Sequence, residues 1–189
     1  MHDKREAHRS MDVRNGTRII DEVENYLRDR NIPFHSTDDG NSVRMCFGGG
    51  AQRTFVEILA DESRRRLKIV AHGGIVVPPA RRLIVALFVA YANSEQDLGA
   101  FVINLHDGNV FFQTSVLVPD KVSEEMIERH LVGAAGTYAK RHYGLMSLLS
   151  SESDFEANVI CSTPALEPRF APPAEKRRAV YDLDCCFTR

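Results

Sequence analysis

The first apolar pattern in the chain has the period of a helix. One stripe recurs at helical spacing and consists of Ile19, Ile20, Val23, Tyr26 and Leu27. A helix packed on one face buries such a stripe. Thr17 can cap its start, and Pro33 disfavours helical backbone at the residue before it. The pattern predicts a helix over about residues 17–30.

Three β-rich runs follow, and polar or glycine-rich connections separate them. They cover residues 42–47, 53–60 and 66–77. In the second run Phe55, Glu57 and Leu59 alternate with Val56 and Ile58, which is typical of a strand with two different faces. Two glycines, Gly73 and Gly74, interrupt the third run and indicate a bulge or bend.

A nearly uniform apolar helix is predicted after Pro78 and Pro79, one of which suits the first helical position. Residues 83–92 are apolar on most sides, and residues 93–95 end the helix. We therefore expect this helix to be buried on more than one face.

The next signal is a hairpin followed by a long amphipathic helix. Asp107-Gly108 separates two β-rich runs within residues 98–118, and this pair favours a type I′ turn, in which both central residues have positive φ. Ser123 can cap a helix that continues to Leu149. Its glycines predict a kink or break near Gly144.

The element order α-β-β-β-α-β-β-α predicts an α+β fold, with an antiparallel sheet of about five strands packed against helices. We assign residues 17–149 to this domain, residues 1–16 to a disordered N-terminal arm, and residues 150–189 to a Pro-rich linker and C-terminal tail. Within the tail, residues 179–183 are β-prone and could add a strand to a sheet edge, in the same chain or in a partner.

Composition narrows the classes of partner. The 189 residues carry a net charge of −2, which gives no drive toward nucleic acid or acidic membranes. The N-terminus lacks the apolar core of a signal peptide, and the longest apolar run is too short to span a membrane. We expect a cytoplasmic protein whose four cysteines are free thiols.

Four stretches resemble the YbjN family, bacterial proteins described as sensory transduction regulators. They are Ile75 to Pro79, Tyr91 to Asn93, Leu98 to Ser115 through the Asp107-Gly108 turn, and Ser123 to Ile127 leading to Tyr143 to Met146. The resemblance covers about two thirds of the chain and implies a fold like that of type III secretion chaperones. It supplies no catalytic residues. The chain departs from the family pattern in its tail and in lacking a Pro-Gly near Tyr143.

No assembled chemistry is recognisable in the sequence. Gly48-Gly49-Gly50 leads into a strand without the Lys and Ser/Thr of a phosphate-binding loop. His130 and His142 lie twelve positions apart on one helix and do not converge. Cys185 and Cys186 are interpreted as free thiols of the tail. We predict no catalytic, cofactor-binding or metal-binding residues, and hence a protein that is not an enzyme.

The leading hypothesis is a regulatory or chaperone-like module that binds another protein or peptide, and that forms a homodimer through its apolar second helix. The candidate protein-binding residues are Ile75, Val77, Leu87, Phe88, Phe112 and Val116. The alternative is a small-ligand or nucleotide sensor with a pocket between sheet and helices. Its anion site would consist of His72, Arg81 and Arg82.

Overall fold

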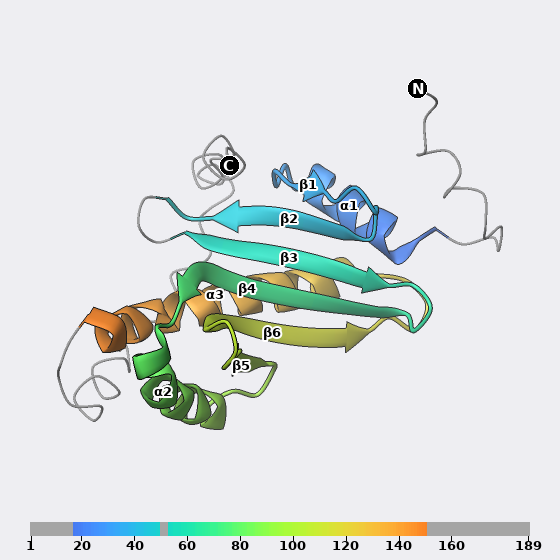
Figure 1. Ribbon diagram of the computed structural model, residues 1–189. Coiled ribbons are helices and arrows are strands. Elements are labelled where there is room, and N and C mark those ends of the chain that lie inside the picture. The colour runs from blue at the N-terminus through green and yellow to red at the C-terminus, as the bar shows by residue number, and fades with distance from the viewer. Residues whose placement is uncertain (1–16, 50–52, 151–189) are drawn as a thin grey trace.

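The fold was obtained as a computed structural model, which describes residues 17–49 and 53–150 (Figure 1). The described part contains six strands, three α-helices and one short 3-10 helix. In chain order they are α1 (Ile19–Asp29), β1 (His35–Ser36), β2 (Ser42–Phe47), β3 (Thr54–Asp61), β4 (Arg66–Val76), η1 (Pro79–Arg81), α2 (Arg82–Ser94), β5 (Ala100–Ile103), β6 (Asn109–Leu117) and α3 (Glu124–Ser150).

All six strands form one antiparallel sheet in the order β1-β2-β3-β4-β6-β5. The predicted α+β fold with an antiparallel sheet is therefore confirmed. The sequence predicted about five strands and missed β1, because a strand of two exposed residues shows no alternation. β4 is the longest strand and pairs with β3 on one side and β6 on the other.

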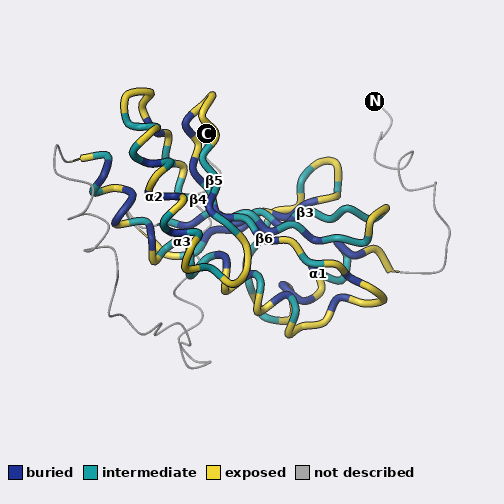
Figure 2. The backbone as a smooth tube through the Cα atoms, turned by 90° about the horizontal axis from the view of Figure 1, so that it is seen from below, coloured by how far each residue is buried: buried dark blue, intermediate teal, exposed yellow. Residues whose placement is uncertain are grey.

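The sheet has two different faces. Helices α1 and α3 pack against one face, and Figure 1 shows α3 behind β4 and β6. Alternate strand residues point into this layer and are buried, including Ile58 of β3, Ile69 of β4 and Phe112 of β6. Their strand neighbours point to the second face and are only half-buried (Figure 2). Burial on one face sets the register, since a shift of one residue would invert both faces.

α1 is anchored at its N-terminus by a residue distant in sequence. The carboxylate of Glu62, in the β3–β4 turn, accepts hydrogen bonds from the backbone N–H groups of Ile19 (3.0 Å) and Ile20 (3.2 Å). Negative charge is favourable at this end of a helix. The predicted cap at Thr17 is wrong: the cap position is Arg18, and no side-chain cap bond is present there. The cap comes from Glu62, which sequence spacing cannot reveal.

The predicted irregularity in β4 is confirmed. Its register with β6 shifts between His72 and Val76, and Gly74 has a φ of +68°. Gly73 lies so close to α3 that a Cβ there would approach the Tyr138 hydroxyl to 3.0 Å. The bulge therefore lets the sheet and α3 approach closely at this point.

The predicted type I′ turn is wrong. Gly108 has a φ of +82°, but Asp107 does not have positive φ, and the loop extends from Asn104 to Gly108. Side-chain acceptors close the loop instead: Asn104 Oδ1 accepts from the His106 N–H (2.9 Å), and Asp107 Oδ1 accepts from the Asn109 N–H (2.9 Å). These local bonds stabilise a longer turn than the dipeptide signal indicated.

Two predictions for the helices are corrected. α3 is one α-helix of 27 residues, without the expected break near Gly144, because Gly144 and Leu145 are buried in its packed face. α2 is buried on one face only within the described residues, since Leu83 and Leu87 are exposed. The predicted arm at 1–16, and the tail with residues 179–183, Cys185 and Cys186, lie outside the described residues.

Candidate protein-binding surface

The outward face of α2 carries the most exposed large apolar side chain of the described helices. Leu83 is 75% exposed and Leu87 is 53% exposed, whereas the adjacent Phe88 is 1% exposed. Ala90 and Ser94 continue the exposed face at helical spacing. No charged residue occurs between Leu83 and Ser94. We call Leu83, Leu87, Ala90 and Ser94 the α2 surface.

Arg82 fixes the start of α2 to the β5–β6 loop. Its guanidinium donates hydrogen bonds to the carbonyl oxygens of Val77 (3.2 Å), Leu105 (2.7 Å) and His106 (3.1 Å). The Val77 N–H donates to the Gly108 carbonyl at 2.8 Å. A Cβ at Gly108 would lie only 2.3 Å from the Val77 oxygen. The loop and the strand-to-helix connection thus fit together only with glycine at this position.

Asn93 fixes the other end of α2 to the edge of the sheet. Its amide oxygen accepts from the Phe101 N–H (2.7 Å), and its amide nitrogen donates to the Phe101 carbonyl (3.0 Å). This pair satisfies the backbone N–H and carbonyl of Phe101, so these two groups of the edge strand β5 are not available to an added strand. Glu95, just past α2, pairs with the buried Arg141 of α3, and Arg141 lowers the pKa of the Glu95 carboxyl. The α2 surface is therefore held on a fixed support.

The structure separates the predicted protein-binding residues. Val77, Phe88 and Phe112 are core residues, each at most 1% exposed, so they are not available to a partner in the folded chain. Val116 packs partly buried against the same core. Ile75 is half-buried at the bulge, and Leu87 lies on the α2 surface. Leu83 was missed as a candidate, although its spacing of four from Leu87 places both on one helical face.

The predicted anion-site residues are not brought together. His72 helps to line a hollow of about 260 Å³, whose lining includes neither Arg81 nor Arg82. The Arg82 guanidinium instead binds the three backbone carbonyls described above. Burial lowers the pKa of His72, and its Nδ1 accepts a hydrogen bond from the Gly74 N–H at 3.2 Å. In its neutral form the His72 ring accepts this hydrogen bond and so stabilises the β4 bulge.

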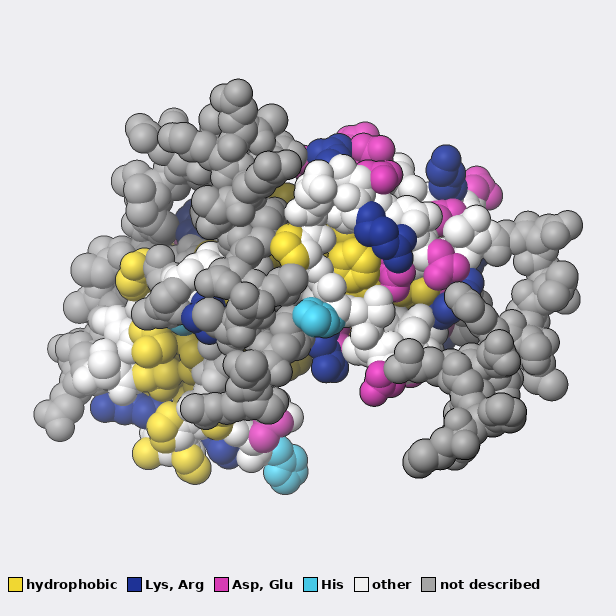
Figure 3. Space-filling view, turned by 90° about the horizontal axis from the view of Figure 1, so that it is seen from above, with side chains coloured by type: hydrophobic (Ala, Val, Ile, Leu, Met, Phe, Trp, Pro, Cys, Tyr) yellow, Lys and Arg dark blue, Asp and Glu magenta, His cyan; other side chains and the backbone are white. Residues whose placement is uncertain are grey.

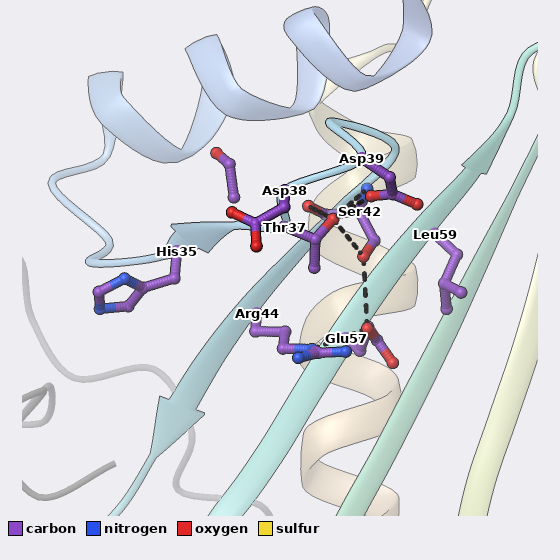
Figure 4. Close-up of a pocket in the computed structure, with 9 residues that line it drawn as sticks. His35, Thr37, Asp38, Asp39, Ser42, Arg44, Glu57 and Leu59 are labelled. Carbon is purple, nitrogen blue, oxygen red and sulfur yellow. Dashed lines mark hydrogen bonds and ion pairs between the residues drawn. The ribbon is translucent and has the colours of Figure 1, made fainter. Parts of the chain in front are cut away.

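A second hollow of about 680 Å³ lies over β1, β2 and β3, and the sequence did not predict it (Figure 4). Two of the carboxylates that line it, Glu57 and Asp39, already accept hydrogen bonds. Glu57 accepts from the Arg44 Nε–H (2.8 Å) and from the Ser42 hydroxyl (3.3 Å). Asp39 accepts from the Thr37 hydroxyl and from the Asn41 N–H, which lower the pKa of its carboxyl. The only sequence signal here was the polar run at residues 37–42.

The two ends of the molecule differ in surface chemistry. In Figure 3 hydrophobic side chains gather at the left, the end that carries α2, and charged side chains of both signs gather toward the other end.

No group of three or more His, Cys, Asp or Glu side chains within the described ranges could hold a metal ion. None of the helices that the structure describes has the length and apolar character needed to cross a membrane.

Residues 20–143 match the model of the YbjN family, described as "Putative bacterial sensory transduction regulator". No curated protein sequence matches the chain.

Three solved structures are similar in fold. YbjN from E. coli is 15% identical, with a TM-score of 0.49 over 77% of this chain and 97% of that chain. A chain of the HopA1-SchA chaperone-effector complex is 14% identical, with a TM-score of 0.42 over 60% and 84%. A chain of the ExsC-ExsE complex is 16% identical, with a TM-score of 0.45 over 72% and 100%. All three TM-scores are below 0.5, so the assignment rests on the family match, which spans well over half of the sequence. This chain belongs to the YbjN family.

Proposed function

We propose that this protein is a non-enzymatic regulatory module that binds another protein through its α2 surface. The observation that carries the proposal is the outward face of α2, where Leu83 and Leu87 are 75% and 53% exposed on a helix without charged residues from Leu83 to Ser94. A surface helix of a globular protein normally places charged and polar residues on its outward face. Membership of a family described as regulators supports the same proposal.

The geometry suits a helix or an apolar segment of a partner. The members of the α2 surface follow the spacing i, i+4, i+7 and i+11, which is the contact pattern of two helices packed side by side. Burying a fully exposed leucine contributes about 1.5–3 kcal/mol, so the two leucines can act as anchors. Ala90 and Ser94 are small and permit close approach of the partner backbone. Arg82 and Asn93 hold α2 in place, which limits the entropy lost on binding.

The alternative of a small-ligand or nucleotide sensor has less support. The two hollows described above are lined largely from the second face of the sheet, whereas a sensor pocket was expected between sheet and helices. Arg82 donates to backbone carbonyls instead of facing His72. We therefore keep protein binding as the proposed function.

The test is capture of partners from the host with three matched full-length proteins. They are the wild type, the double variant Leu83→Glu/Leu87→Glu, and the control Leu117→Glu. Leu117 is 68% exposed at the end of β6, so the control adds a charge to an equally exposed apolar site elsewhere. We expect a stoichiometric protein that the wild type and the control capture and the double variant loses. Equal capture by all three proteins would contradict the α2 surface as the binding site.

Homodimerisation is a linked proposal, because a second copy could cover the same leucines. Native mass spectrometry of the wild type and of Leu83→Glu/Leu87→Glu separates the possibilities. A wild-type dimer that dissociates in the double variant identifies the second copy as an occupant of the α2 surface. A wild-type monomer at high micromolar concentration would contradict homodimerisation and leave the surface for a different protein.

A further inference from the structure

The bulge of β4 leaves a recess in the second face of the sheet, opposite α1 and α3. It has a volume of about 260 Å³. Gly74 leaves it open, because a Cβ on this residue would meet no atom within 4 Å. Val70, His72 and Phe111 line it from two neighbouring strands, and Asp107 lines it from the β5–β6 loop. We call the recess with these five lining residues the bulge hollow.

The size of the bulge hollow suits one side chain. Sites for complete small-molecule ligands measure roughly 300–1,000 Å³, and the bulge hollow is smaller than this range. At protein interfaces a few large side chains that fill such pockets, above all Trp, Tyr and Arg, contribute most of the binding energy. Val70 and Phe111 supply apolar contact for such a side chain. The size therefore favours a single side chain of a partner protein over a nucleotide.

Asp107 gives the bulge hollow a negative charge. Its Oδ1 accepts from the Asn109 N–H (2.9 Å), and its Oδ2 accepts from the Asn104 amide nitrogen (2.8 Å). The bond from the Asn109 N–H lowers the pKa of the Asp107 carboxyl, so the group is ionised at neutral pH. A carboxylate has about four acceptor positions, so each oxygen can accept one further hydrogen bond.

No cation lines the bulge hollow. Its lining in the described part of the chain contains no Lys or Arg, and burial lowers the pKa of His72, which favours the neutral ring. The positive charge of Arg82 also acts on Asp107, but the Arg82 guanidinium is bound to three backbone carbonyls. Arg44 is paired with Glu57 at 2.8 Å, so their opposite charges offset each other beside His72. Asp107 therefore retains its capacity for a cationic partner.

We propose that the bulge hollow binds an arginine side chain of a partner protein. The guanidinium donates two parallel hydrogen bonds to the Asp107 carboxylate, and its plane lies against the Phe111 ring. Arginine combines both contacts, since its guanidinium is planar and its donors form a fork that matches a carboxylate. A lysine ammonium matches the charge alone.

The bulge hollow and the α2 surface lie at the same end of the molecule. Asp107 lines the hollow, while the carbonyls of the adjacent Leu105 and His106 accept from Arg82 at the start of α2. The proposal rests on the proposed function only for the source of the arginine. Free arginine carries the same guanidinium, so the test includes it as a separate probe.

A titration followed by NMR tests the site on the full-length protein. The probe is arginine with an acetylated N-terminus and a methylamide C-terminus. The matched control is the same compound of citrulline, which has nearly the same shape without the charge. We expect saturable shift changes at the amides of Gly74, Asn109 and Phe111, with a dissociation constant at least about tenfold lower for the arginine probe. Equal dissociation constants, or no saturable change with the arginine probe, would overturn the proposal. Free arginine that binds more tightly than the blocked probe would overturn the assignment to a partner protein.

Two variants locate the binding group. Asp107→Asn retains an acceptor oxygen for the Asn109 N–H but removes the charge, so the roughly tenfold preference for arginine over citrulline should disappear. Asp97→Asn removes an exposed carboxyl outside the hollow and should retain the preference. A preference that persists in Asp107→Asn, or that is lost in Asp97→Asn, would overturn the proposal. The titration uses no partner protein, so its failure leaves the capture experiment on the α2 surface unaffected, and a failed capture leaves the titration unaffected.

Discussion

α1 and α2 both bury one face in the same domain, but their outward faces differ. α1 presents Asn25, Arg28 and Asp29, and Arg28 bonds to Glu24 and Asn25 within the helix. α2 presents Leu83 and Leu87. The charged and polar side chains on the outward face of α1 are readily solvated. The outward face of α2 instead exposes apolar side chains and carries no charge. The comparison separates residues that hold the fold from residues that are available for recognition.

The largest difference in the free energy of unfolding should appear between substitutions at a buried and at an exposed position of α2. Phe88→Ala should lower the free energy of unfolding by about 3–5 kcal/mol, because it removes a fully buried aromatic ring from the core. Leu87→Ala, one position earlier but exposed, should change it by less than about 0.5 kcal/mol. Urea denaturation of both variants measures the difference. Similar losses for the two variants would mean that Leu87 is covered in the folded protein.

The support of α2 can be tested at Gly108. Gly108→Ala should cost about 2–4 kcal/mol, because alanine at a φ of +82° is strained and its Cβ would meet the Val77 oxygen. The matched control is Gly133→Ala in α3, where a Cβ meets no atom within 4 Å. The control should stabilise the protein by about 1 kcal/mol through helix propensity. Thermal unfolding compares the two, and a neutral Gly108→Ala would exclude the close contact between the loop and Val77.

α1 should depend on its distant cap. Glu62→Ala should lower stability by about 1 kcal/mol, because the N–H groups of Ile19 and Ile20 lose their side-chain acceptor. Glu62→Gln retains an acceptor oxygen and should lose less. Exchange of the first amides of α1 is the sensitive measurement. Equal exchange in the wild type and Glu62→Ala would show that the carboxylate contributes little to the cap.

Mild acid should produce the smallest effect, and it should act at the α2 end of the molecule. Burial lowers the pKa values of His72 and His142, which lie at or beside the β4 bulge. Their neutral forms are favoured in the folded state, so this part of the stability is complete above the ordinary histidine pKa of about 6.5. It is lost as the pH falls below that value and through the lowered pKa. The urea midpoint should therefore decrease from pH 7.5 to pH 5, and less so in His142→Gln; an unchanged slope in that variant would contradict a role for His142.

The periodicity of apolar residues predicted those helices and strands whose structure follows from the local sequence. α1, the three strands from β2 to β4 and the bulge at Gly73 and Gly74 follow from local pattern alone. The pattern failed where a distant residue decides the outcome. Glu62 caps α1 from another turn, and Arg82 and Gly108 shape the β5–β6 loop through contacts with Val77. No local rule contains these contacts.

The candidate binding residues show the same limit. The sequence of α2 is so uniformly apolar that inside and outside could not be separated, and Phe88 was grouped with Leu87. Strand residues were equally ambiguous, and Phe112 proved to be a core residue. Only the packing of α2 against β5 and α3 determines which of its apolar residues remain exposed. The exposed pair Leu83 and Leu87 therefore emerges from the structure.

The most direct test of the central claim measures the affinity of the captured partner for three full-length proteins: the wild type, Leu87→Lys on the outward face of α2, and Asp29→Lys on the exposed side of α1. Both substitutions place a lysine on an exposed helix position. Isothermal titration should show a loss of at least about thirtyfold for Leu87→Lys, the effect of a binding hot spot, and an unchanged dissociation constant for Asp29→Lys. Equal affinities for the wild type and Leu87→Lys would contradict the α2 surface as the recognition site of this protein.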